Sequence, residues 1–183
     1  MSTPRRPAVA ERQEPLRARY AEHPEEAVTH KAARTSSARV PANDPFHGEV
    51  EVGSEQGTVV AFGLDRSVGG LGDAPNPGDL LCAALAACTD GTVRMIANLL
   101  GVELTELEVE VTGELDVRGC LAADPSVRVG FEALETTVHL AAAEGTDERK
   151  LRRLVAAAER YCVNADTLQG GIEVTTRPAV ASA

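Results

Sequence analysis

The segment from residue 72 to residue 101 constrains the fold more strongly than any other part of the chain. It begins GDAPNPGDLLCAALAACTDGT, a turn-rich approach that leads into an almost unbroken apolar run. Asn76 is a natural N-cap, Pro77 suits the first helical position, and Asp79 places a carboxylate in the first turn, where the helix dipole favours an anion. Gly101 suits the position just after a helix end. The segment therefore predicts one long helix, from Pro77 to about Leu100.

The rest of the chain is expected to supply strands and a second helix. Alternating apolar residues and turn residues predict strands at 27–35, 47–53, 58–64, 102–117, 127–141 and 171–177. A glycine- and proline-rich loop occupies 67–78. Thr146 can cap the second helix, which carries apolar residues on one face as far as Cys162. The order βββ–α–ββ–α–β predicts an α+β fold, in which antiparallel strands are covered by two main helices.

Length and charge limit the classes of function. The 183 residues suit one domain, which we expect at 27–178, after an N-terminal extension at 1–26 and before a tail at 179–183. We expect the extension to be partly disordered or to form a short helix. A net charge of −10 argues against nucleic-acid or anionic-membrane partners, because these need clustered Lys and Arg. No secretory signal is recognisable, and the apolar part of the long helix, about 10 residues, is too short to span a bilayer. These features predict a cytoplasmic protein.

The four cysteines form no recognisable metal site. Cys82, Cys88, Cys120 and Cys162 show neither a CxxC pair nor a Cys/His ligand spacing, so we expect no metal and no cofactor. Cys82 and Cys88 lie six residues apart on one helix, which separates them by about 9 Å along its axis, too far for a disulfide. Cys82 is expected in the core, and Cys120 in a loop or at a strand end.

Cys88 and Cys162 differ in their expected electrostatics. Cys88 lies about three turns inside its helix, where the dipole has faded, so a thiolate there needs a cation from another segment. Arg34, Arg39 and Arg66 are the candidates. Cys162 ends the second helix, where the dipole disfavours a thiolate. This asymmetry suits a pair in which Cys88 reacts first and Cys162 resolves its sulfenic acid, although both cysteines could equally be core packing.

Two segments carry a family resemblance. GGLGDAPNPGDLLCAALAACTDGTVRMIANLLGVEL, followed about seventy residues later by AERYCVNADTL, resembles the OsmC family, which includes the organic hydroperoxide resistance proteins. The family motifs are a proline-led helix ending in Ala-Ala-Cys and a second cysteine after a helix, usually written Cys-Pro-x-Ser-x-x-Leu. The resemblance covers roughly residues 27–178.

The resemblance implies an OsmC-like fold, an intertwined homodimer and two active sites at the subunit interface. Cys88 would be the peroxidatic thiolate and Cys162 the resolving thiol. In the peroxidase branch an arginine from the N-terminal strands, here Arg34 or Arg39, and a glutamate near the start of the first helix hold the thiolate. The implied substrates are organic hydroperoxides, and the implied reductant is a dithiol.

The sequence departs from this pattern in two places near the cysteines. Gly78 stands where the peroxidases carry the glutamate, and the adjacent Asp79 points about 100° away around the helix. The second motif reads Cys162-Val163-Asn164-Ala165, without the usual proline and serine. The leading hypothesis is a thiol-dependent peroxidase that reduces organic hydroperoxides in oxidative-stress defence. The alternatives are a non-catalytic dimer that binds a small hydrophobic molecule and a purely structural dimer.

Overall fold

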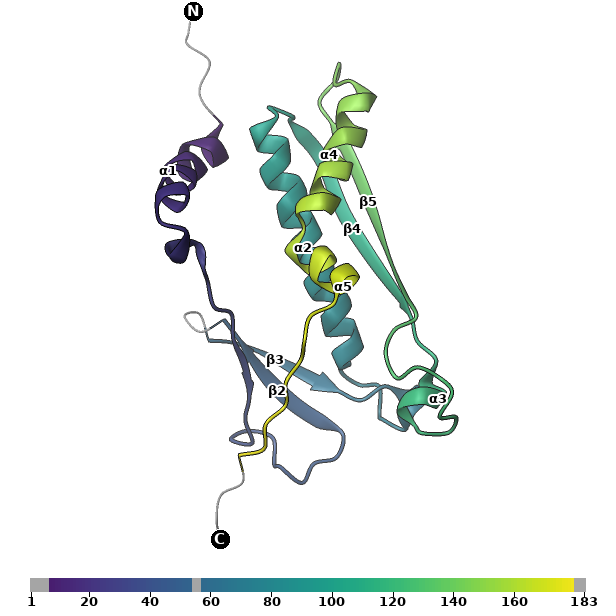
Figure 1. The fold of residues 1–183 in the computed structure, drawn as a ribbon. Helices are drawn as coiled ribbons and strands as arrows, with labels where there is room; N and C mark the ends of the chain where they lie inside the picture. The colour runs from purple at the N-terminus through teal and green to yellow at the C-terminus, as the bar shows by residue number, and fades with distance from the viewer. Residues whose placement is uncertain (1–6, 54–56, 180–183) are drawn as a thin grey trace, which may run out of the picture.

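The computed structural model describes residues 7–53 and 57–179 and confirms an α+β fold with antiparallel sheets (Figure 1). The helices are α1 (Ala8–Glu22), α2 (Pro77–Leu99), α3 (Val117–Cys120), α4 (Glu148–Tyr161) and α5 (Val163–Gly170), with short 3-10 turns at Pro24–Ala27 and Arg66–Val68. The strands are β1 (Ala33–Thr35), β2 (His47–Val52), β3 (Thr58–Gly63), β4 (Leu104–Glu114) and β5 (Ala133–Ala142).

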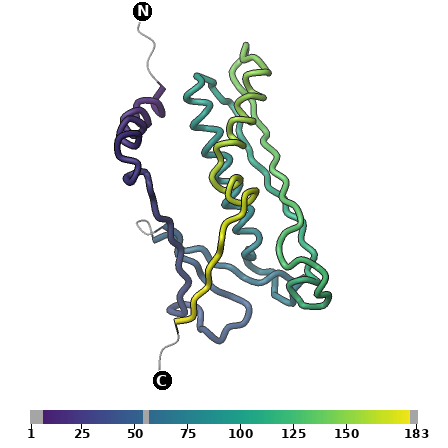
Figure 2. Tube along the Cα trace, viewed as in Figure 1, coloured from purple at the N-terminus to yellow at the C-terminus, as the bar shows by residue number. Residues whose placement is uncertain are grey.

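The strands form two separate sheets. β1, β2 and β3 make an antiparallel N-terminal sheet in which Val50 pairs with Val60, and β4 pairs with β5 in a two-stranded sheet in which Val109 pairs with Val138. The trace in Figure 2 shows the N-terminal sheet set apart from the β4–β5 ribbon. The long helix α2 therefore follows one sheet and precedes the other.

The core lies where α2 and α4 pack together against the β4–β5 sheet. Val93 and Ala97 of α2 meet Leu154 and Ala158 of α4, and all four are buried. Leu107 and Val138 cover this cluster from the sheet. The alternation in β4 is as expected, since Leu107 and Val109 are half-buried while Glu106, Glu108 and Glu110 are exposed. This packing fixes α4, and with it the position of the residues that follow Tyr161.

The ends of α2 confirm the signals read from the sequence. The Asn76 side chain accepts hydrogen bonds from the N–H groups of Gly78 (2.8 Å) and Asp79 (3.1 Å). The Asp79 carboxylate accepts one in return from the Asn76 N–H at 2.8 Å, which completes a capping box. Gly101 has a φ of 60°, the left-handed conformation that ends a helix.

Several expected boundaries are wrong. The strand expected at 27–35 is reduced to β1. Asp147, rather than Thr146, caps α4. The strand expected from residue 127 begins only at Ala133. In the N-terminal extension, for which a short helix was one expectation, α1 begins at Ala8. The expectations for residues 1–6 and 180–183 lie outside the described residues.

The C-terminal part differs most from expectation. An unexpected helix, α5, follows Cys162 directly, so the chain turns into a second helical segment rather than leaving the site. Residues 171–177, expected to be a strand, are extended but pair with no strand in the described chain. Ile172 and Val174 there are 71% and 81% exposed. Residues 171–177 thus have the alternating pattern of a strand but no partner strand in the described chain.

The apolar part of α2 is longer than the sequence analysis expected, although the helix itself has the predicted length. Among the described residues it is the one helix that meets the length and composition of a membrane span, with a mean hydropathy of 1.5 over an 18-residue window. The short apolar run counted in the sequence therefore does not by itself argue against a membrane span. A single such helix is weak evidence for a membrane, because the central helix of a globular protein passes the same test.

Candidate functional site

The structure brings Cys88 and Cys162 together. Cys88 lies on α2 and is half-buried, whereas Cys162 lies between α4 and α5 and is fully buried. Both are free thiols, and they lie close enough that each shifts the pKa of the other. The other two cysteines are elsewhere: Cys82 is half-buried one and a half turns earlier on α2, and Cys120 is exposed on α3.

The start of α5 affects both sulfurs. The backbone amides of Asn164 and Val163 act to lower the pKa of Cys88, and those of Ala165 and Asn164 act to lower the pKa of Cys162. The Thr89 hydroxyl lies 3.6 Å from the Cys162 sulfur and is itself buried.

The electrostatic asymmetry of the pair is opposite to the expected one. Burial raises the pKa of Cys88 above its ordinary value, and contact with Cys162 raises it further, although the Asn164 and Val163 amides oppose this. Burial also acts to raise the pKa of Cys162, but the hydrogen bonds from Ala165, Cys88, Thr89 and Asn164 together lower it.

The expectation failed because it rested on α4 alone. Cys162 follows the C-terminus of α4, as predicted, but it is also the N-cap residue of α5. The free N–H groups at a helix start favour a negative charge. The start of α5 therefore favours a thiolate at Cys162, whereas the end of α4 was expected to disfavour it. Within this chain Cys162 is the sulfur that ionises more readily.

Asn164 sets the position of α5 against α2. Its side-chain Nδ2 donates to the carbonyl oxygen of Ala84 at 2.8 Å. Ala84 lies one helical turn before Cys88, so this bond fixes the start of α5 at the level of that sulfur. Thr89 and Asn164 were not among the predicted site residues. The only signal for them was their position, each a polar residue close to one of the two cysteines.

Of the predicted arginines, Arg34 lies on β1, Arg39 lies in the turn that follows β1, and Arg66 begins a 3-10 turn. Arg34 Nη2 is 2.8 Å from Glu51 Oε2, and Arg39 pairs with Glu49. Together with Ser36 these four side chains line a small cleft. Arg66 donates to the carbonyl oxygen of Leu71 in the loop before α2. Within the residues that the structure describes, the groups that shift the pKa of Cys88 come from α5 and Cys162, so neither Arg34 nor Arg39 joins the sulfur pair.

The structure also explains why position 78 carries no side chain. A Cβ on Gly78 would lie 2.9 Å from Asn76 Oδ1 and 3.2 Å from the Phe131 ring. The same ring lies over Gly113 of β4, where a Cβ would come within 2.5 Å of it. Phe131 therefore occupies the space next to the start of α2. A glutamate at 78 would have to displace this ring.

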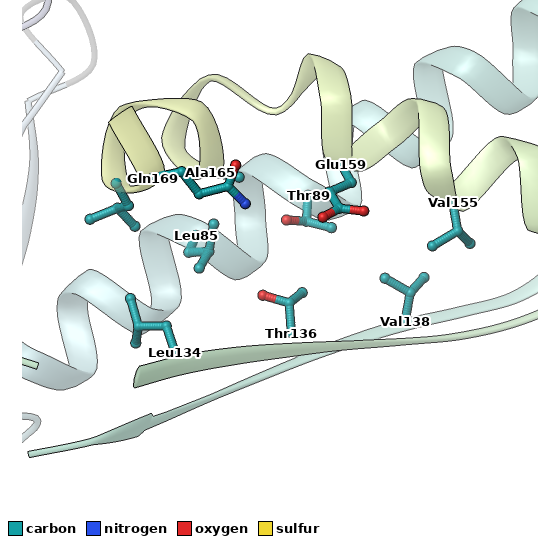
Figure 3. A pocket seen from close by; sticks show the side chains of 10 residues that line it. Leu85, Thr89, Leu134, Thr136, Val138, Val155, Glu159, Ala165 and Gln169 are labelled. Atoms are coloured by element: carbon teal, nitrogen blue, oxygen red, sulfur yellow. The ribbon is translucent and has the colours of Figure 1, made fainter. Parts of the chain in front are cut away.

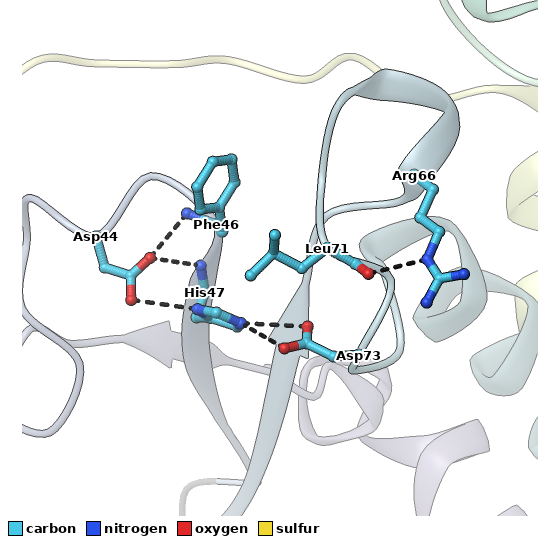
Figure 4. A network of polar contacts seen from close by, with 6 residues as sticks. All are labelled: Asp44, Phe46, His47, Arg66, Leu71 and Asp73. Atoms are coloured by element: carbon cyan, nitrogen blue, oxygen red, sulfur yellow. Dashed lines mark hydrogen bonds and ion pairs between the residues drawn. The ribbon is translucent and has the colours of Figure 1, made fainter.

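The loop before α2 is anchored to the start of β2 (Figure 4). The His47 imidazole lies between two carboxylates, with Nδ1 3.2 Å from Asp44 Oδ2 and Nε2 3.2 Å from both Asp73 oxygens. The Asp73 and Asp44 carboxylates raise the pKa of His47. The two ring nitrogens point to different carboxylates, and no group of three His, Cys, Asp or Glu side chains in the described part could hold a metal ion.

A cavity of about 280 Å³ adjoins the sulfur pair. Figure 3 shows Leu134, Thr136 and Val138 of β5 facing Leu85 and Thr89 of α2 across it, with Glu159 of α4 and Ala165 of α5 at its border. Thr89 is the link, since it lines the cavity and also contacts the Cys162 sulfur. The site thus places two thiols near a cavity that leucine, valine, threonine, glutamate and glutamine side chains line together.

Comparisons with known proteins agree with this architecture. The family model described as OsmC-like protein matches residues 70–177, more than half of the chain. An uncharacterized Bacillus subtilis protein, YmaD, is 25% identical over 149 residues, which cover 78% of this chain and 91% of that protein.

Solved structures show the same fold. The OsmC like protein from Mycoplasma pneumoniae superposes with a TM-score of 0.61 at 15% identity, over 78% of this chain and 89% of that chain. An organic hydroperoxide resistance protein OsmC from Legionella pneumophila superposes with a TM-score of 0.55 at 24% identity, over 78% and 91%. The family match, which includes α2 and both cysteines of the pair, shows that the chain belongs to the OsmC-like protein family.

Proposed function

We propose that the protein is a cytoplasmic thiol-dependent peroxidase that reduces organic hydroperoxides and so protects against oxidative stress. The observation that carries this proposal is the closeness of a half-buried thiol, Cys88, to a fully buried second thiol, Cys162. Two of the similar folds, from Legionella pneumophila and Elizabethkingia anophelis, are described as organic hydroperoxide resistance proteins. A protein that only packs its cysteines does not require backbone amides that act to lower the pKa of both thiols.

The proposed reaction has three steps. The Cys88 thiolate attacks the terminal oxygen of the hydroperoxide, the O–O bond breaks, and the alkoxide takes up a proton and leaves as an alcohol. Cys88 is then a sulfenic acid. The Cys162 sulfur attacks the Cys88 sulfur, a disulfide forms, and the hydroxyl leaves with a proton as water. A dithiol then supplies two electrons and two protons, which restore both thiols.

Exposure and ionisation divide the two roles. A hydroperoxide reaches Cys88 first, because Cys162 is 0% exposed. The lowered pKa of Cys162 suits the second step, which needs a thiolate to attack the sulfenic acid. For the first step Cys88 must lose its proton. We propose that Arg34 or Arg39 of a second copy of the chain approaches Cys88 and favours its thiolate, as an opposite charge does within about 4–6 Å.

A homodimer is part of this proposal. The chain exposes 13940 Å², whereas a compact monomer of this mass would expose about 8,400 Å². The single chain is therefore less compact than a monomeric domain of this mass. Within the described chain the segment 171–177 pairs with no strand, and the β4–β5 sheet has no third strand. A second copy that intertwines with the first would provide the missing neighbours.

We therefore predict a dimer in solution, measured by light scattering coupled to size-exclusion chromatography. Ile172→Asp combined with Val174→Asp should shift the mass toward the monomer, because both side chains are exposed in the single chain and would be buried in the dimer. Glu173→Lys lies on the opposite side of the extended segment and is the control. A monomeric wild-type protein at micromolar concentration would rule out this part of the proposal.

The peroxidase is tested on the wild-type protein. One equivalent of cumene hydroperoxide should convert the reduced protein to a form lighter by about two hydrogens, and peptide mapping should find Cys88 joined to Cys162. Excess dithiothreitol should restore the thiols and sustain turnover, while hydrogen peroxide serves as the comparison substrate. A protein that keeps four free thiols after this treatment is not such a peroxidase.

The cavity next to Thr89 supports a second candidate function, the binding of a small hydrophobic molecule without catalysis. Its lining by leucines and valines and its volume of about 280 Å³ fit a short aliphatic ligand. Native mass spectrometry of the purified protein distinguishes the two functions. A retained apolar ligand together with no hydroperoxide consumption would favour binding.

A further inference from the structure

The side chain of Thr89 connects α2 to the fully buried thiol. Its Oγ1 lies 3.6 Å from the Cys162 sulfur, a contact between residues 73 positions apart in the chain. Thr89 is 6% exposed and Cys162 is 0% exposed, so the contact lies inside the molecule. Thr89 directly follows Cys88 in the sequence. The contact therefore joins the second thiol to the turn of α2 that carries the first.

A second threonine on α2 shows that this contact is not the ordinary use of the side chain. A threonine hydroxyl inside a helix commonly bonds to the carbonyl oxygen four residues earlier. Thr92 does so, since its Oγ1 lies 2.7 Å from the Cys88 carbonyl oxygen, and it is as buried as Thr89. The Thr89 hydroxyl has the Cys162 sulfur as its partner instead. Two equally buried hydroxyls on one helix thus serve different groups.

We propose that Thr89 is a positioning residue for the resolving thiol, because its buried hydroxyl donates to the Cys162 sulfur and favours the thiolate that attacks Cys88. A thiolate has no proton to give, so in the ionised pair the hydroxyl is the donor. Hydrogen bonds to an ionised acceptor are stronger than those between neutral groups. The proposal rests on the proposed peroxidase function, in which Cys162 performs the second step.

The other groups that act on Cys162 leave this hydroxyl a distinct role. Burial acts to raise the pKa of Cys162, whereas the Ala165 amide, Cys88, the Thr89 hydroxyl and the Asn164 amide act to lower it. The two amides belong to the backbone, and Cys88 is the reaction partner. Thr89 is therefore the one of these groups that a side-chain substitution can remove without altering the backbone or the thiol pair.

The charged side chains beside this contact are exposed or ion-paired. Those next to it along α2, α4 and α5 are Asp90, Glu159, Arg160 and Asp166. From β5, the side chains that line the adjoining cavity are uncharged: Leu134, Thr136 and Val138. Water and salt screen exposed charges. Among the described residues, Cys88 is the titratable group that shifts the pKa of Cys162.

The chain offers a matched set of variants for a test. Thr89→Val removes the hydroxyl and keeps the branched shape of the side chain, while Thr89→Ser keeps the hydroxyl. Thr92→Val is the control, because it removes an equally buried hydroxyl whose partner is a backbone carbonyl oxygen rather than a sulfur.

The test uses dithiodipyridine, which oxidises thiols without a hydroperoxide. The Cys88 thiolate attacks one sulfur of the reagent, its S–S bond breaks, and one pyridinethiolate leaves with the electron pair. The Cys162 thiolate then attacks the Cys88 sulfur of this mixed disulfide, a second pyridinethiolate leaves, and the internal disulfide forms. Acid quenching followed by mass spectrometry measures the two steps separately over a series of pH values.

The expected effect is confined to the second step. In the acidic part of the pH profile, Thr89→Val should form the internal disulfide about threefold more slowly than the wild type, because less Cys162 thiolate is present. Its profile should move to higher pH, while the first step keeps the wild-type rate. Thr89→Ser should restore the second step, and Thr92→Val should match the wild type in both.

Three results would overturn the proposal: a wild-type profile in Thr89→Val, a failure of Thr89→Ser to restore the second step, or an equal shift in Thr92→Val. If circular dichroism shows that Thr89→Val is unfolded, Thr89→Ala and Thr89→Ser are compared instead, because they differ from each other only in the hydroxyl. Equal second steps in these two would then refute the inference. A protein that consumes no hydroperoxide can still show the Thr89 effect, so the two proposals fail separately.

Discussion

Replacement of Cys88 by serine is expected to abolish hydroperoxide consumption, with a loss of several orders of magnitude in the rate of the first step. A serine hydroxyl at this half-buried position stays protonated at neutral pH and is a poor nucleophile without an adjacent base. The Cys162 sulfur cannot replace it, because it is fully buried. The measurement is the decay of cumene hydroperoxide in the presence of dithiothreitol.

The other cysteines provide the controls for this experiment. Cys120→Ser should keep full activity, because Cys120 is exposed on α3, away from the other cysteines, and its thiol donates to the Val117 carbonyl at 3.2 Å. Cys162→Ser should consume about one equivalent of hydroperoxide and then stop at a Cys88 sulfenic acid, which dimedone traps. Turnover by Cys88→Ser at the wild-type rate would exclude the proposed mechanism.

α2 could be predicted because its signals are local. The cap at Asn76, the proline at position 77 and the glycine at 101 each act within a few residues, and all three are found in the expected role. The i,i+4 pair of Arg94 with Asp90, at 2.6 Å, is equally local. Signals of this range are fully contained in the sequence.

α5 could not be predicted from the sequence. Because the sequence analysis lacked this helix, it expected the two thiol pKa values in the reverse order. The helix is only eight residues long, and its N-cap, Cys162, offers no side-chain cap. Short helices without caps depend on tertiary contacts, here the bond from Asn164 to Ala84. The helix dipole at Cys162 depends on α5. Which of the two thiols has the lower pKa therefore could not be predicted from neighbouring residues in the sequence.

Other features depend on pairs that are distant in sequence. Phe131 lies close to both Gly78 and Gly113, a contact between residues some twenty to fifty positions apart that the sequence does not indicate. Residues 171–177 do alternate as a strand would, but within the described chain they have no neighbouring strand to pair with. Arg34 and Arg39 are in the same situation, because their predicted role needs a second copy.

The largest effect on stability is expected for Leu154→Ala, at about 2–5 kcal/mol in the free energy of unfolding. Leu154 is 0% exposed and is among the largest fully buried side chains of the described chain. It joins α4 to Val93 and Ala97 of α2, and the truncation would leave a cavity at that contact. Urea denaturation at a fixed protein concentration measures the change, because dimer stability depends on concentration.

Leu121→Ala is the matched control, since Leu121 is 51% exposed just after α3 and should change the free energy by no more than about 0.5 kcal/mol. Loss of less than 1 kcal/mol in Leu154→Ala, about one half of the lower expected value, would contradict the packing of α4 on α2.

The packing of α4 on α2 also has a chemical consequence. α4 delivers Cys162 to Cys88, so loosening it should slow disulfide formation after a stoichiometric oxidation, even under conditions in which the variant remains folded. Leu121→Ala should form the disulfide at the wild-type rate, because it leaves the α2–α4 contact intact.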